Sequence, residues 1–159
     1  MTALYQPSML SHMSIESHFS PKPKSIAEVA HSVRNGHDYT CAVKEFLDEV
    51  INSTDAPETR YGFYQIPSSF YEDAPIELDS PAHMAHLAGL AENLALLTGS
   101  QPPAWTEEEA YFLKEPVVLG GANSRDHIMA ETGSAFRRRL LFCGSSLSKL
   151  FKKRPRPAA

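Results

Sequence analysis

The stretch SPAHMAHLAGLAENLALLTG, residues 80–99, decides the fold. Ser80 can cap the start of a helix, and Pro81 suits the first turn because its missing N–H would have no partner there. Gly99 supplies the stop. Between these signals the apolar residues cover a wide arc: Met84, Leu87, Ala88, Leu90, Ala91, Leu94 and Leu97. The pattern predicts one central, mostly buried helix over residues 81–97.

Two amphipathic helices are predicted upstream of this central helix. Ser25 and Glu28 have the spacing of a capping box, and Asn35-Gly36 supplies a stop, so the first helix lies between them. The second covers residues 38–52, where apolar residues recur at three- and four-residue spacing. Residues 54–79 hold five aromatic residues and three prolines, which predicts an ordered wrap with one short helix near residues 60–66.

Several short helices are predicted downstream. Thr106 can cap an acidic turn that leads into residues 110–113, and further helices fit residues 124–130, 134–142 and 145–153. No run of alternating residues is long enough to predict a sheet. The sequence therefore predicts an all-α fold, a compact bundle of five to seven short helices around a central helix.

Charge divides the chain unequally. The first 136 residues carry 7 basic and 19 acidic side chains, whereas the last 23 carry eight Lys and Arg and no carboxylate. Such an acidic body with a cationic end can attract a polyanion, or dock the cationic end onto its own acidic face. The organisation we expect is a mobile leader over residues 1–24, one helical domain over residues 25–148 and a basic tail over residues 149–159.

Composition excludes several classes of protein. The N-terminus lacks the apolar core of a secretory signal, and polar residues interrupt the longest apolar stretch, so no transmembrane helix is expected. Cys41 and Cys143 form neither a disulfide framework nor a metal quartet, and we expect buried free thiols. These features favour a cytoplasmic protein with no membrane partner.

No catalytic constellation is apparent. His83 and His86 lie three residues apart, a spacing that lets two imidazoles reach one metal, but no third ligand completes a known motif. A place on the solvent-facing arc of the central helix explains them as well. Gly120-Gly121 lacks the Lys of a phosphate loop, and no serine sits in a nucleophile elbow. We expect no catalytic, metal or cofactor residues and no enzyme.

Basic residues are the candidate contact groups. The helix pair over residues 26–52 is not a helix-turn-helix, because its second helix is too acidic for a major groove. Arg137, Arg138 and Arg139 spread over about 200° of helical arc. At least one should fold back and pair with an acid or stack on an aromatic ring such as Trp105. The candidate acids are Glu107, Glu108, Glu109 and Glu131.

The basic tail has two open interpretations. It can hold phosphates, or it can be a solvated end that keeps the protein in solution. Its charged residues are Lys149, Lys152, Lys153, Arg154 and Arg156.

Two elements carry a resemblance. PAWT at residues 103–106 and ETGSAFRRR at residues 131–139 resemble a group of small uncharacterised bacterial proteins with a PAWT element and an ESPxAFRRRxIF-like element at similar separation. The likeness covers residues 25–148. This chain departs from it with Gly133 in place of Pro and with Leu140-Leu141 after the arginines. Because the two elements recur together, the resemblance implies that Trp105 and the three arginines form one structural corner.

Members of this group look like companions of nucleotidyltransferase-type toxin–antitoxin pairs. The resemblance implies a non-enzymatic protein-interaction module, an antitoxin-like or regulatory companion whose protein partner is a nucleotidyltransferase-like toxin. The alternative is a nucleic-acid-associated regulator that uses the basic C-terminal segment. The candidate contact residues are Trp105, Arg137, Arg138, Arg139 and the five basic tail residues.

Overall fold

The structure is a computed structural model and describes residues 21–55, 57 and 62–144. The fold is all-α, as predicted. Its α-helices are α1 (Ile26–Arg34), α2 (Tyr39–Asn52), α3 (Pro81–Leu97), α4 (Arg125–Glu131) and α5 (Ser134–Arg137). The predicted leader lies outside the described residues over 1–20. In the described part, no helix is long and apolar enough to cross a membrane.

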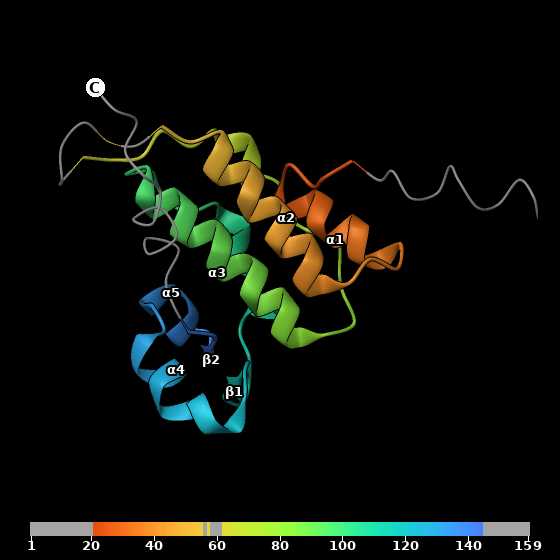
Figure 1. Cartoon of the computed structure of the whole chain (residues 1–159), viewed down its shortest axis with the longest axis vertical. Coiled ribbons are helices and arrows are strands. Elements are labelled where there is room, and N and C mark those ends of the chain that lie inside the picture. Colours follow the sequence, from red (N-terminus) through yellow and green to blue (C-terminus); the bar gives the residue numbers. More distant parts are fainter. Residues whose placement is uncertain (1–20, 56, 58–61, 145–159) are drawn as a thin grey trace, which may run out of the picture.

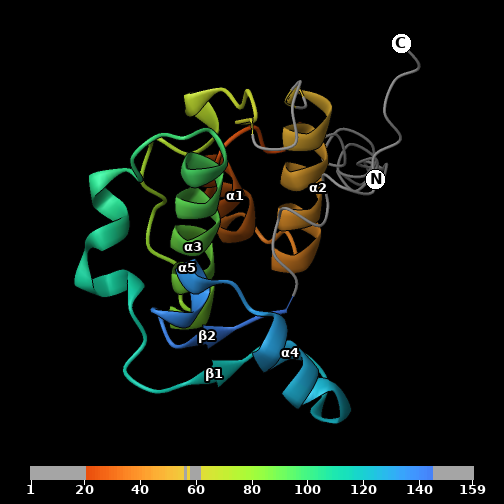
Figure 2. The same ribbon diagram turned by 90° about the vertical axis from the view of Figure 1, so that its left-hand side faces the viewer.

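Helix α3 forms the centre of the fold, as its sequence predicts. The Ser80 hydroxyl accepts a hydrogen bond from the His83 amide at 3.3 Å, and Gly99 takes the left-handed conformation, φ +71°, just beyond the helix. Figure 1 shows α2 running alongside α3 with α1 beyond it, and in Figure 2 α1 lies behind these two helices, between them in the view. Helix α5 packs on α3 where Gly89 leaves room: a Cβ built on Gly89 would lie 2.3 Å from the Phe136 ring.

Helices α1 and α2 begin where the sequence predicts. Ser25 accepts a hydrogen bond from the Glu28 amide at 3.1 Å, and Asp38 accepts one from the Cys41 amide at 3.0 Å. The Glu28 carboxylate returns to the Lys24 amide instead of the Ser25 amide. Both helices bury their apolar faces, which consist of Ile26, Val29, Ala30, Ala42, Val43, Phe46 and Val50.

The predicted helix near residues 60–66 is wrong over residues 62–66, which are irregular. There the Gln65 amide donates to the Asp55 carbonyl at 3.3 Å, and the Tyr64 amide donates to the Leu97 carbonyl at 2.9 Å. The backbone is therefore satisfied by distant partners and not by a local helix. A 3₁₀ turn, η2 (Ser68–Phe70), then places Phe70 against Phe46, with ring centroids 6.0 Å apart.

The helix predicted after Thr106 is replaced by two 3₁₀ turns, η3 (Ala104–Glu107) and η4 (Glu109–Tyr111). Glu108 is extended, with φ −66° and ψ 144°, and separates them. The Thr106 hydroxyl does not cap the turn that follows, because it donates back to the Pro103 carbonyl at 2.7 Å. Both turns pack against α3.

The helix predicted over residues 134–142 is too long, because α5 ends at Arg137. Leu140 adopts φ +59°, a left-handed conformation that no α-helix continues through. The next residues form β2 (Leu141–Phe142), which pairs in parallel with β1 (Val117–Val118). A two-residue ladder is too short to leave an alternating pattern in the sequence. The helix predicted over residues 145–153 lies outside the described residues.

Candidate functional site

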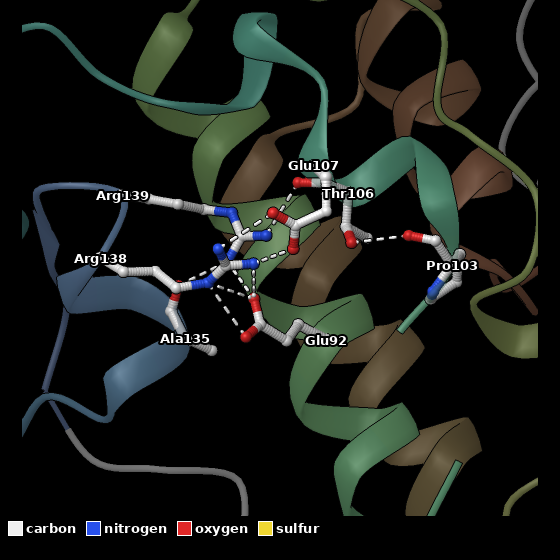
Figure 3. A network of polar contacts seen from close by, with 7 residues as sticks. All are labelled: Glu92, Pro103, Thr106, Glu107, Ala135, Arg138 and Arg139. Carbon is white, nitrogen blue, oxygen red and sulfur yellow. Dashed lines mark hydrogen bonds and ion pairs between the residues drawn. The ribbon is translucent and has the colours of Figure 1, made fainter. Parts of the chain in front are cut away.

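Four charged side chains meet where α5 crosses α3 (Figure 3). Arg138 donates from Nε to both carboxylate oxygens of Glu92, at 3.1 and 3.0 Å, and from Nη1 to Glu107 at 3.1 Å. Arg139 Nη1 donates to Glu92 Oε2, and Nη2 donates to the Thr106 carbonyl at 2.9 Å. The two arginines and two glutamates thus compensate one another in charge.

Burial divides this network into an inner and an outer half. Arg139 has no exposed surface and Glu92 is 8% exposed, whereas the Glu107 side chain is 56% exposed. Hydrogen bonds from Arg138 lower the pKa of Glu107. A buried guanidinium costs free energy unless it is paired, and Glu92 with two backbone carbonyls, those of Ala135 and Thr106, meets most of that need.

The predicted corner is present in part, since Arg138 and Arg139 bind Glu107 and Thr106, next to Trp105 in the chain. Glu107 was among the expected acids and Glu92 was missed, while the Glu131 carboxylate lies 3.7 Å from His127 Nε2. The aromatic ring beside the guanidinium groups is Phe112, whose centroid lies 5.2 Å from Arg138 Cζ and 5.0 Å from Arg139 Cζ. Glu92 had a signal in the sequence: a single carboxylate in an otherwise apolar arc needs a cation.

Trp105 and Arg137 contact other parts of the fold. The Trp105 ring packs edge-on against Tyr111, with centroids 5.1 Å apart, and its Nε1 donates to the Glu72 carbonyl at 3.0 Å. Arg137 donates from Nε to the Thr132 carbonyl at 2.8 Å and from Nη2 to carbonyls in the last turn of α4. Arg137 therefore caps α4.

Thr132 fixes the chain that leaves this corner. Its Oγ1 accepts hydrogen bonds from the Cys143 amide at 3.2 Å and the Gly144 amide at 3.1 Å, and donates to the Ile128 carbonyl at 2.7 Å. The last described residues are thus tied to the C-terminal end of α4.

The two histidines of α3 are partly buried and pack against Tyr39. The Tyr39 hydroxyl lies 2.6 Å from His86 Nδ1, and its ring stacks on His83 with centroids 3.7 Å apart. The other face of His86 lies over Phe136, with ring centroids 5.4 Å apart. Burial lowers the pKa of His86 to about 4. Within the residues that the structure describes, no three His, Cys, Asp or Glu side chains are placed to share a metal ion.

The cysteines differ from each other. Cys41 is exposed in the first turn of α2, so the expectation of a buried thiol is wrong for it. Cys143 is half-buried, and burial raises the pKa of its thiol to about 11. Neither environment favours a reactive thiolate, because the pKa of Cys41 is raised as well, chiefly by its hydrogen bond with Asp38.

An exposed apolar end, consisting of Phe63 and Leu96, lies where α3 stops. Phe63 is 64% exposed and Leu96 49%, and they are the large apolar side chains most open to solvent in the described part of the chain. A Cβ built on Gly99 would lie 2.9 Å from the Phe63 ring, so that ring covers the helix terminus three residues beyond Leu96. Sequence reasoning missed this pair, because Leu96 falls on the helix that the pattern predicts to be buried.

The five basic residues of the predicted tail lie outside the described residues. The structure brings Arg138 and Arg139 against Thr106 and Glu107 at the end of the PAWT segment, whereas Arg137 contacts Thr132 and the end of α4. It does not place Lys149, Lys152, Lys153, Arg154 or Arg156.

None of the family models, curated proteins or solved structures compared with the chain matches it.

Proposed function

We propose that this protein is a non-enzymatic protein-interaction module, an antitoxin-like or regulatory companion that acts by binding a protein partner. The observation that carries the proposal is the exposed apolar end. Two large apolar side chains left open beside a charged surface favour contact with another protein, since burying them would remove apolar area from water.

The internal use of the arginines supports the same proposal. Arg139 has no surface to offer a partner, and the donors of Arg138 are directed to Glu92 and Glu107. Arg137 is exposed, but it is engaged with carbonyls of α4. The arginine run therefore maintains the fold beside α3 and leaves recognition to other surfaces.

The resemblance suggests the kind of partner. It is a nucleotidyltransferase-like toxin, and the cytoplasm of a bacterium is where the pair would meet. The experiment looks for a nucleotidyltransferase gene beside the gene of this protein and then tests whether its product co-purifies with the full chain. Replacing both residues of the apolar end, Phe63→Ser with Leu96→Ser, should weaken the complex at least about tenfold. That loss corresponds to about 1.4 kcal/mol.

A matched control uses two exposed positions away from the apolar end. Ala110→Ser with Ala130→Ser should leave the affinity unchanged. Equal affinity of the wild type and the Phe63→Ser/Leu96→Ser variant, with the helical circular dichroism retained, would show that the partner does not use this end.

The alternative function is nucleic-acid binding through the basic tail. It is favoured by one observation, the eight basic residues without a carboxylate in the last 23 residues. Since three of those eight are Arg137, Arg138 and Arg139, which have internal partners, the phosphate contacts would come from residues 149–156.

A further inference from the structure

One face of α3 is covered by α5 along only part of its length. Gly89 contacts Phe136, and Glu92 receives Arg138 and Arg139. Leu96 lies four residues after Glu92 and seven after Gly89, so it is the next position on the same face. Its 49% exposure shows where the cover formed by α5 ends.

A polar side chain beside this face also lacks a partner. Asn93 lies four residues after Gly89, and its Nδ2 is buried without a hydrogen-bond partner among the described residues. A buried amide group left unpaired costs about 1–3 kcal/mol, so this part of α3 carries a hydrogen-bond donor that the described residues do not satisfy.

Acidic side chains surround the same end of α3. We call Asp55, Glu72 and Asp73 the acidic rim. Asp55 is joined through Gln65 and Tyr64 to the Leu97 carbonyl, and Tyr71, which precedes Glu72, lies with its hydroxyl 3.3 Å from Thr98 Oγ1. All three rim residues are exposed, and no ion pair between described residues involves them. The C-terminal dipole of α3 adds negative potential.

We infer that the chain's own residues 149–156 cover the exposed apolar end when no partner is bound. This segment reads KLFKKRPR, so it offers two adjacent apolar side chains, Leu150 and Phe151, flanked by cations. Apolar anchors match Phe63 and Leu96, and the cations match the acidic rim. The inference rests on the proposed function in that both use the same surface.

The chain can reach this surface. Gly144 is tied to Thr132 beside α5, which packs near Gly89 and Glu92 of α3. From there the end of α3 lies about 10 Å further along the helix, at 1.5 Å per residue. The six residues from 145 to Leu150 span up to about 20 Å when extended. In this arrangement α5 covers α3 around Gly89 and Glu92, and residues 149–156 cover the exposed apolar end. A protein partner that binds this end must displace residues 149–156.

Limited trypsin digestion of the full chain tests the inference. Trypsin can cut the tail after Lys149, Lys152 and Lys153, and the exposed Lys24 and Lys114 give internal references. In Phe63→Ser/Leu96→Ser, cleavage in the tail should be at least about ten times faster than in the wild type, since the cut follows release. Cleavage after Lys114 should not change.

Charge variants give a matched pair for the same digestion. Asp55→Lys with Asp73→Lys should speed cleavage of the tail, because the rim would then repel it. Glu115→Lys with Asp126→Lys makes the same change of charge at exposed residues elsewhere and should not. Equal acceleration by both pairs would overturn the acidic rim as the docking surface.

A variant in the tail avoids any effect on folding of the body. Leu150→Ser with Phe151→Ser should shift the amide resonances of Phe63 and of residues 96–99. Unchanged resonances there would overturn the inference. Equal rates of tail cleavage in the wild type and in Phe63→Ser/Leu96→Ser would also overturn it. Protection of the tail that appears only when dimers form at higher concentration would overturn it as well, because the tail would then bind a second copy.

The same variants separate this inference from the proposed function. The tail variant should bind the partner at least as tightly as the wild type, because a competitor is removed, whereas Phe63→Ser/Leu96→Ser should bind it less tightly. If the tail is unprotected but the apolar-end variant still loses the partner, the inference alone fails. If the tail is protected but the partner is retained, the proposed function alone fails.

Discussion

Glu92 is a single carboxylate on which the pairing of two consecutive arginines depends. It lies in the apolar arc of α3, is 8% exposed and receives hydrogen bonds from Arg138 and Arg139. A buried ion pair adds little net stability over an apolar replacement, but removing one partner leaves a buried charge uncompensated. The main effect of losing Glu92 is therefore the uncompensated charge of buried Arg139, and the net stability of the ion pair itself is small.

Replacing Glu92 should destabilise the fold strongly. Glu92→Gln should lower the free energy of unfolding by about 3–5 kcal/mol, because Arg139 stays charged in a site without solvent. Glu107→Gln removes the exposed carboxylate of the same network and should cost at most about 1 kcal/mol. Urea unfolding of the two variants measures the difference. A similar decrease in the free energy of unfolding for both variants would mean that Arg139 does not need Glu92 to balance its charge.

His86 should make stability depend on pH. Its pKa is about 4 in the fold and about 6.5 when unfolded, so between these values only the unfolded chain takes up the proton. His86 does not lower the free energy of unfolding above pH 6.5. As the pH falls from 6.5 towards 4, protonation of the unfolded chain lowers that free energy by at most about 3 kcal/mol. Carboxylates with lowered pKa values, such as Glu107, act in the same direction.

The contribution of His86 is isolated by comparing variants. The free energy of unfolding should fall less steeply between pH 6.5 and 4 in His86→Phe than in the wild type. His127→Asn, at an exposed histidine, should keep the steeper wild-type slope. Parallel slopes in the wild type and His86→Phe would contradict a lowered pKa of this half-buried imidazole.

At the scale of elements, α1, α2 and α3 could be predicted because their signals are local. Caps at Ser25, Asp38 and Ser80 and apolar spacing act within a few residues of the structure they specify. The region of residues 104–111 and the end of α5 could not, since distant contacts decide them. Leu140 turns the chain into a ladder with β1, more than twenty residues earlier, and no local pattern marks that partner.

The candidate site could likewise be predicted only where its signals are local in the sequence. The local run of arginines indicated that one of them would be buried, and the resemblance implied its meeting with the Trp105 segment. Which acid would receive them depended on how α5 crosses α3, and that crossing is set by Gly89 and Phe136. The exposure of Leu96 likewise depends on where α5 ends, and the apolar pattern of α3 does not predict that position.

Two leucines near the end of α3 should differ sharply. Leu94 has no exposed surface, so Leu94→Ala should lower the free energy of unfolding by about 2–5 kcal/mol through lost burial and a cavity. Leu96 is 49% exposed, and Leu96→Ala should change it by about 0.5 kcal/mol or less. Thermal and urea unfolding of the pair give the values. If Leu96→Ala also lowered the free energy of unfolding by more than about 2 kcal/mol, the Leu96 side chain would have to be buried, which contradicts its exposure among the described residues.

At the scale of the whole molecule, charge is the dominant asymmetry. Arg137, Arg138 and Arg139 are bound by carbonyls and carboxylates of the body, and the other five basic residues of the last 23 lie outside the described residues. The body retains exposed acids on several elements. Long-range attraction between the two parts of the chain, or between the tail and a polyanion, is the consequence of that distribution.

Salt dependence distinguishes the two functional proposals. If the five basic tail residues hold phosphates, the logarithm of the affinity for duplex DNA should fall against the logarithm of salt concentration with a slope of about −3 to −5. Deleting residues 149–159 should abolish that binding and leave the helical circular dichroism intact. We expect the truncated chain to retain its protein partner. Salt-independent DNA binding that survives the deletion would exclude the tail as the phosphate contact.

The tie between Thr132 and the last described residues has a mechanical consequence. Because Thr132 Oγ1 accepts from the Cys143 and Gly144 amides, tension applied to the C-terminus is delivered first to the end of α4 and to the β1–β2 ladder. Leu141, fully buried just before that point, resists extraction next. A pull on the tail would therefore load the end of α4 and the β1–β2 ladder before the contacts of Arg138 and Arg139 with Glu92 of α3.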